Sequence, residues 1–140
     1  MTEEESIKYM LNDNVSLAVF NGGKVATFNE RGVKTLLRLV QEDKDLLCGA
    51  TVADRIVGKA AALLLINGGV KSIYGQVMSS SATNVLRAHG VKYSYGTLTE
   101  RIVNRAGTDI CPMEKAVERC GNHKDVVAVL TAALEKMNKR

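Results

Sequence analysis

The chain has 140 residues, enough for one domain with a substantial core that needs neither disulfides nor a metal. Its composition, 46% hydrophobic and 24% charged with one proline, is typical of a globular protein and excludes a disordered chain. The net charge is only +4, and four tyrosines and two phenylalanines are its only aromatic residues, so nucleic-acid binding is disfavoured while a small anionic ligand stays compatible.

The sequence also predicts a cytoplasmic protein without a membrane segment. The longest wholly apolar run, 60–66, is too short to span a bilayer, and the acidic residues 2–5 are unlike the start of a secretory signal. The three cysteines, Cys48, Cys111 and Cys120, stand at long and irregular spacings. Such spacing is typical of reduced thiols rather than of a disulfide framework.

The first third of the chain predicts a helix, a hairpin and a second helix. A capping-box pattern at 2–5 opens a short helix. Alternating apolar residues over 15–19 and a second apolar segment over 24–28 flank a glycine turn, which predicts a β-hairpin. Apolar residues then recur at helical spacing over 33–40, so we expect a helix that stops in the charged segment 42–45.

The middle of the chain predicts a central helix. From 51 to 66 it is almost wholly apolar, so other elements should cover most of this helix. The segment 98–104 is ambiguous in its predicted secondary structure. The remaining elements that we expect are a strand over 72–78, a helix from the serines at 79–81 to His89, a strand over 91–95, a helix over 111–120 and an amphipathic helix from 126 onward.

These elements predict an α/β fold in which 1–140 form a single domain. Strands joined through helices require parallel pairing and right-handed crossovers, whereas the opening hairpin is antiparallel. We therefore expect a three-layer α/β/α arrangement on a mixed sheet.

Polar and reactive side chains gather around one predicted helix start. Asn104 and Arg105 come shortly before Cys111. Pro112 suits the first helical position, which makes Cys111 the N-cap and lets Glu114 reach back to a free backbone N–H. The helix dipole favours a thiolate at such a place. The alternative is that Asn104, Arg105 and Glu114 only hold the turn and Cys111 is a small buried apolar group.

Further candidates lie at two other predicted helix starts. Asp54 is either a general base or an acid that the helix dipole favours. Lys59 is a cation in an apolar helix, so we expect it to pair with Asp54, Glu114 or an anionic ligand. Ser79 and Ser80 either cap the next helix or bind an anion through the same backbone N–H groups.

The two histidines, His89 and His123, have no cysteine or histidine neighbours at ligand spacing. The sequence therefore predicts no metal site and no cofactor. Both histidines are interpreted as structural or surface residues.

Motifs at 50–62, 104–108 and 111–117 together resemble the DUF1893 family of uncharacterised bacterial domains, over nearly the entire chain. That family is similar in fold to the cytidine deaminases, so the resemblance implies a cytidine deaminase-like fold. A zinc deaminase has His or Cys two residues before Glu at its central helix, and Pro-Cys-x-x-Cys at the next helix. Neither 52–54 nor 79–84 supplies these ligands, so the resemblance implies no zinc deamination.

Three functions are compatible with these features. The first is a zinc-less deaminase-like domain that binds a nucleotide-like or other small anionic metabolite and catalyses a metal-free reaction. The second is a thiol enzyme or redox sensor that uses Cys111, and the third is a non-catalytic interaction subunit. We also expect a homo-oligomer and one concave site that brings together Asp54, Lys59, Asn104, Arg105, Cys111 and Glu114. The residues assigned to catalysis are Asp54, Cys111 and Glu114, and those assigned to ligand binding are Lys59, Ser79, Ser80, Asn104 and Arg105.

Overall fold

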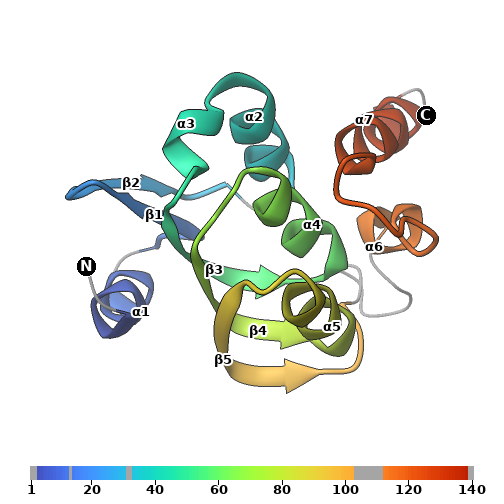
Figure 1. Cartoon of the computed structure of the whole chain (residues 1–140). Helices are drawn as coiled ribbons and strands as arrows, with labels where there is room; N and C mark the ends of the chain where they lie inside the picture. Colours follow the sequence, from blue (N-terminus) through green and yellow to red (C-terminus); the bar gives the residue numbers. More distant parts are fainter. Residues whose placement is uncertain (1–2, 13, 31–32, 103–111, 139–140) are drawn as a thin grey trace.

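The computed structural model of the protein describes residues 3–12, 14–30, 33–102 and 112–138. The strands are β1 (Leu17–Asn21), β2 (Lys24–Phe28), β3 (Thr51–Val57), β4 (Ser72–Ser79) and β5 (Lys92–Thr99). The helices are α1 (Glu3–Asn12), α2 (Lys34–Glu42), α3 (Lys44–Leu47), α4 (Lys59–Asn67), α5 (Ser80–Ala88), α6 (Pro112–Ala116) and α7 (Val126–Asn138). Figure 1 shows how these elements are arranged around one sheet.

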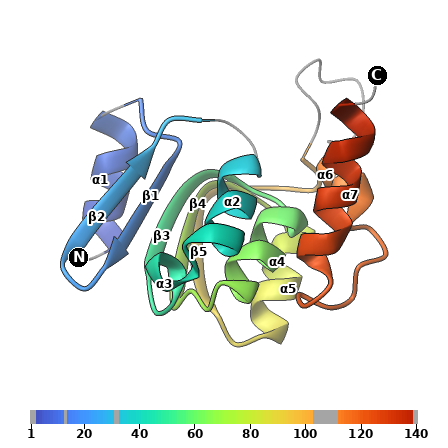
Figure 2. The same ribbon diagram turned by 90° about the horizontal axis from the view of Figure 1, so that it is seen from above.

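The sheet has five strands in the order β2-β1-β3-β4-β5. β1 pairs antiparallel with both β2 and β3, whereas β3, β4 and β5 are parallel. The crossover helices α4 and α5 lie against each other on one face, as right-handed crossovers in one direction require (Figure 2). α1 packs against β1 and β3, where Tyr9 joins a separate apolar cluster with Phe20 and Ala53. The predicted α/β fold with a mixed sheet flanked by helices is confirmed.

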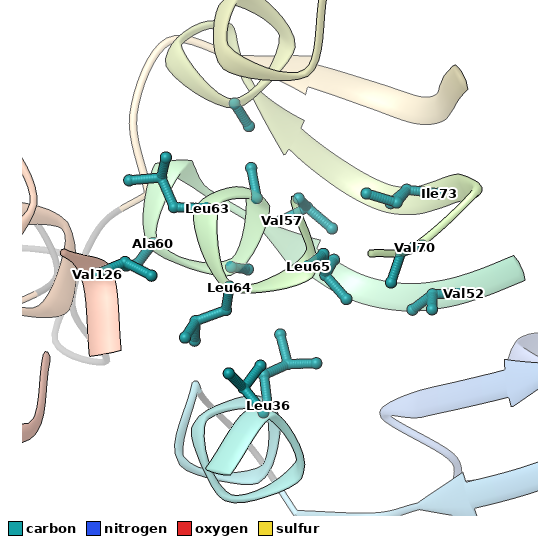
Figure 3. Close-up of a cluster of buried hydrophobic side chains, with 14 of the residues drawn as sticks. Leu36, Val52, Val57, Ala60, Leu63, Leu64, Leu65, Val70, Ile73 and Val126 are labelled. Atoms are coloured by element: carbon teal, nitrogen blue, oxygen red, sulfur yellow. The ribbon is translucent and has the colours of Figure 1, made fainter. Parts of the chain in front are cut away.

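α4 is the centre of the hydrophobic core. Figure 3 shows Leu64 pointing toward Leu36 of α2, and Val126 of α7 beside Ala60. Burial of this helix on nearly every side removes a large apolar area from water, which is the main stabilising contribution to such a fold. The buried residues of α4 are Ala60, Ala61, Ala62, Leu63, Leu64 and Leu65.

The predicted helix over 51–66 is wrong in its first half. Residues 51–57 form β3, and the helix begins only at Lys59, with Gly58 as its N-cap. β3 lies between two partner strands, so its backbone groups bond to β1 on one side and to β4 on the other. β-branched residues such as Val52 and Ile56 suit such a strand better than a helix. As a result, Asp54 lies in the middle of a strand and not at a helix start.

Smaller differences concern the ends of elements. α2 ends in the charged segment, as expected, but the short helix α3 begins within the same segment. Asn21 holds the end of α3, because its Nδ2 donates to the carbonyls of Leu46 and Cys48 at 2.9 Å each. β5 continues to Thr99, so the first part of 98–104 is strand. The other predicted helices and strands are found close to the expected places, with α6 limited to Pro112–Ala116. None of the described helices combines the length and the apolar character that crossing a membrane requires.

Candidate functional site

The candidate site lies where the parallel strands end. β3 leads through Gly58 into α4, and β4 leads through Ser79 into α5, so both helices begin at the same edge of the sheet. Ligands of open α/β sheets bind at the carboxyl ends of the strands. We call the residues gathered here, Gly58, Lys59, Ser79, Ser80 and Glu114, the carboxyl-edge cluster.

Glu114 caps the first turn of α4 from another part of the chain. Its Oε1 accepts a hydrogen bond from the backbone N–H of Lys59 at 2.7 Å, and its Oε2 accepts one from that of Ala60 at 2.8 Å. These are N–H groups that have no partner inside the helix, and the helix dipole favours a negative charge beside them. Glu114 lies in the first turn of α6, as predicted, but its carboxylate caps α4 rather than its own helix.

Burial raises the pKa of the Glu114 carboxyl above its ordinary value of 4.5. The hydrogen bonds from Ala60 and Lys59 oppose this rise, as does the positive charge of Lys59. The ionised form of Glu114 is therefore disfavoured by its surroundings and is held in place by the two backbone N–H groups.

Gly58 makes room for this contact. A Cβ atom at position 58 would overlap with Oε1 of Glu114 and would lie 2.9 Å from Cγ1 of Ile102. This position requires a residue that has no side chain. It does not require a backbone conformation that favours glycine, because its φ is −96°. The sequence signal for this role is a lone glycine directly before an alanine- and leucine-rich helix.

Lys59 and Glu114 lie together, as expected, but the lysine ammonium does not make the contact. The backbone N–H of Lys59 binds Glu114, while its Nζ donates to the carbonyl oxygen of Glu118 at 3.2 Å. The side chain of Lys59 is partly exposed. The ammonium is thus close to the carboxyl edge, where it donates a hydrogen bond to Glu118 at the surface.

Ser79 is confirmed as the capping residue of α5, whereas Ser80 is the first residue of the helix and does not cap it. The fully buried Ser79 accepts a hydrogen bond on Oγ from the backbone N–H of Ala82 at 3.1 Å, which satisfies one free donor of the helix. The hydroxyl of Ser80 donates to the carbonyl oxygen of Thr99 at 3.5 Å, which links α5 to the end of β5. Anion binding by the backbone N–H groups at the start of α5 stays a prediction.

The expectation that Asp54 shares a site with Lys59 and Glu114 is wrong, because Asp54 lies in the middle of β3, apart from this cluster. It stands opposite Leu17 of β1 and Gly75 of β4. Burial raises its pKa from 3.8 to about 7, although the backbone N–H groups of Ile56 and Arg55 donate to its carboxylate and lower the value. A carboxyl group with this pKa gains and loses a proton at neutral pH, as a general acid or base does. Among the described residues, no ion pair joins Asp54 to Lys59.

Three predicted site residues, Asn104, Arg105 and Cys111, lie outside the described residues, and their roles stay predictions. The rings of His89 and His123 contact each other edge to face, with centroids 5.4 Å apart. In the part of the chain that the structure describes, no group of three or more His, Cys, Asp or Glu side chains is arranged to hold a metal ion.

Comparisons with known proteins agree with this architecture. A solved structure of a DUF1893 family protein (TM1506) from Thermotoga maritima is similar to the chain, with a TM-score of 0.82 and 24% sequence identity over 94% of this chain and 92% of that one. No curated protein matches the chain significantly. The model of the family described as "Domain of unknown function (DUF1893)" matches residues 5–134. The chain therefore belongs to the DUF1893 family.

Proposed function

We propose that the chain is a zinc-less, cytidine deaminase-like domain that binds a small anionic, nucleotide-like metabolite at the carboxyl edge of its sheet. The observation that carries the proposal is the cap of α4. Two backbone N–H groups there hold a carboxylate at 2.7 and 2.8 Å, next to a lysine. A ligand carboxylate or phosphate has the same charge and accepts the same hydrogen bonds.

Glu114 then acts as an internal competitor for the ligand. Both of its oxygens are occupied by backbone donors, so it is not free to act on a substrate while it caps α4. Burial disfavours the ionised form of Glu114 at this place. Its carboxylate gains hydration when a ligand anion displaces it, and this gain lowers the free-energy cost of the displacement. The ammonium of Lys59, which donates to the carbonyl oxygen of Glu118 in this structure, turns to the bound anion. Asn104 and Arg105 supply further donors.

Asp54 supplies the acid–base group of a metal-free reaction in this proposal. Its pKa of about 7 provides both protonation states at neutral pH. It lies four positions before Gly58 on β3, the strand that leads to α4. The catalytic role is separable from binding, because Asp54→Asn should leave ligand affinity nearly unchanged and abolish turnover of any substrate that is found.

A ligand screen with matched variants tests the binding proposal. Thermal-shift measurements with a panel of nucleotides, nucleosides and small phosphorylated or carboxylated metabolites should reveal a stabilising anion, whose affinity is then measured by calorimetry. Lys59→Met should weaken binding about tenfold, since it removes a charge-assisted hydrogen bond, and Glu114→Gln should strengthen binding by weakening the competitor.

The control is Lys71→Met, which removes an exposed lysine at the opposite edge of the sheet and should leave affinity unchanged. A panel in which no compound stabilises the protein would contradict the proposal. Equal affinities of the Lys59→Met and Lys71→Met variants would place any bound anion elsewhere.

A further inference from the structure

β5 is an open edge of the sheet. It pairs with β4 from Lys92 to Thr99, and its other side pairs with no strand in the described part of the chain. Most of its residues are exposed, including Tyr95 at 42% and Leu98 at 46%. An edge strand leaves backbone N–H and C=O groups that another strand can bind.

β5 lacks two features of sequence that commonly protect an edge strand, proline and charges along its length. Its eight residues contain no proline, and its only charge is Lys92 at the first position. The next charge is Glu100, which directly follows the strand and is exposed. Among the described residues, neither Lys92 nor Glu100 takes part in an ion pair. The edge is therefore long and uncharged between a cation at one end and an anion at the other.

We propose that β5 pairs antiparallel with β5 of a second copy of the chain, which joins the two sheets into one. Two identical strands pair in this way around a twofold axis perpendicular to the sheet. Residues directly across from each other then point to the same side of the sheet. The axis passes between one residue of β5 and the same residue of the second copy. With Gly96 on the axis, Lys92 of each chain faces Glu100 of the other.

Other positions of the axis lose this match. With the axis at Tyr95, Lys92 faces Leu98 of the second copy, and with the axis at Thr97 it faces Ile102. The Gly96 register instead brings together two pairs of opposite charges, which stabilise an antiparallel pair when they lie directly across from each other. It also places Tyr95 opposite Thr97, a favourable pair of an aromatic and a β-branched side chain.

The same charge pattern identifies the partner as a second copy. β5 has a cation at its start and an anion just after its end. In an antiparallel pair of two such strands, the cation of each copy meets the anion of the other. A strand from another protein would need the same order of charges at the same separation. This surface goes beyond the proposed ligand site and does not depend on it, because it uses the outer side of β5.

Charge reversal with rescue tests the proposal. Lys92 and Glu100 are about 26 Å apart along an extended strand, too far for contact within one chain. Sedimentation equilibrium over a range of micromolar concentrations at low salt should show a wild-type dimer. Lys92→Glu and Glu100→Lys should each raise the dimer Kd at least about fivefold, because each replaces two attractive pairs with two repulsive ones. The double variant should restore the wild-type Kd.

The control Lys71→Glu changes the net charge as Lys92→Glu does, at an exposed position outside β5, and should leave the Kd unchanged. Circular dichroism of each variant verifies that the fold is kept. A wild-type protein that is monomeric throughout the concentration range would overturn the proposal. So would a dimer that is insensitive to both single reversals, or single defects that the double variant does not repair.

Discussion

Gly58 and Glu114 are so close that the carboxylate occupies the space where a side chain on residue 58 would begin. The contact joins the end of β3 to α6, which is far away in the sequence. It gives the central helix α4 two hydrogen bonds that its own residues do not supply. The stability of the core and the chemistry of the candidate site therefore depend on the same carboxylate.

Gly58→Ala should destabilise the protein by about 2 kcal/mol or more, because the new methyl group pushes Glu114 away from the N–H groups of Lys59 and Ala60. Urea unfolding measures this loss. The control is Gly121→Ala, since a Cβ on this exposed glycine would meet no atom within 4 Å. Equal stabilities of the two variants would show that Glu114 has room to move without cost.

Glu114→Ala and Lys59→Met should differ sharply in stability. The first leaves two backbone N–H groups without a partner and should cost about 2 kcal/mol. The second removes only the surface hydrogen bond to the carbonyl of Glu118 and keeps the cap, so it should cost less than about 1 kcal/mol. Urea unfolding of the two variants and the wild type measures both losses in free energy. A larger loss for Lys59→Met would mean that the ammonium, and not the backbone, holds Glu114.

The free energy of unfolding should fall as pH rises from about 4 to about 7. In the folded protein Asp54 keeps its proton up to a pKa of about 7, whereas in the unfolded chain it loses the proton near 3.8, so the folded state binds more protons in this window. The loss should reach at most about 4 kcal/mol. The raised pKa of Glu114 acts in the same direction.

Asp54→Asn keeps the acceptor oxygen and removes the titration, so unfolding measured across this pH window should show a flatter slope than in the wild type. Asp45→Asn, a change on the exposed surface of α3, serves as the control and should keep the wild-type slope. Parallel slopes for wild type and Asp54→Asn would show that Asp54 is ionised in the folded protein throughout the window.

Cys111 should react with iodoacetamide at a lower pH than an ordinary thiol if the chain is a thiol enzyme or redox sensor, since a helix start favours the thiolate. The measurement needs Cys48 and Cys120 replaced by serine. Cys48 is exposed and would react as well, whereas Cys120 is buried and lies with Sγ 3.3 Å from the carbonyl oxygen of Asn122. Ordinary reactivity of Cys111 would leave ligand binding and subunit interaction as the remaining hypotheses.

Local patterns were enough to predict most of the fold. The glycine turn fixed the hairpin of β1 and β2. Ser79 marked the start of α5 because its hydroxyl accepts a backbone N–H group three residues further on. The failure at β3 has an equally local cause. Val52, Ala53 and Val57 fit both a buried helix and a buried strand, and periodicity alone does not separate the two.

The site was harder to predict, because its central contact is not local. The sequence identified Glu114 as a capping residue, but it could not show which helix Glu114 caps. That choice depends on α6 packing against α4, which only the tertiary structure provides. The environment of Asp54 was missed for the same reason, since its raised pKa comes from burial in the folded protein.

The cap of α4 also affects the order in which the protein is completed during synthesis. All five strands and α4 leave the ribosome before α6, because Glu114 follows every one of them in the chain. Until α6 emerges, the helix at the centre of the core has two backbone donors at its first turn that still lack their carboxylate. A segment that follows every strand in the chain therefore completes the first turn of the central helix, and a nascent chain that carries the complete sheet still lacks this cap.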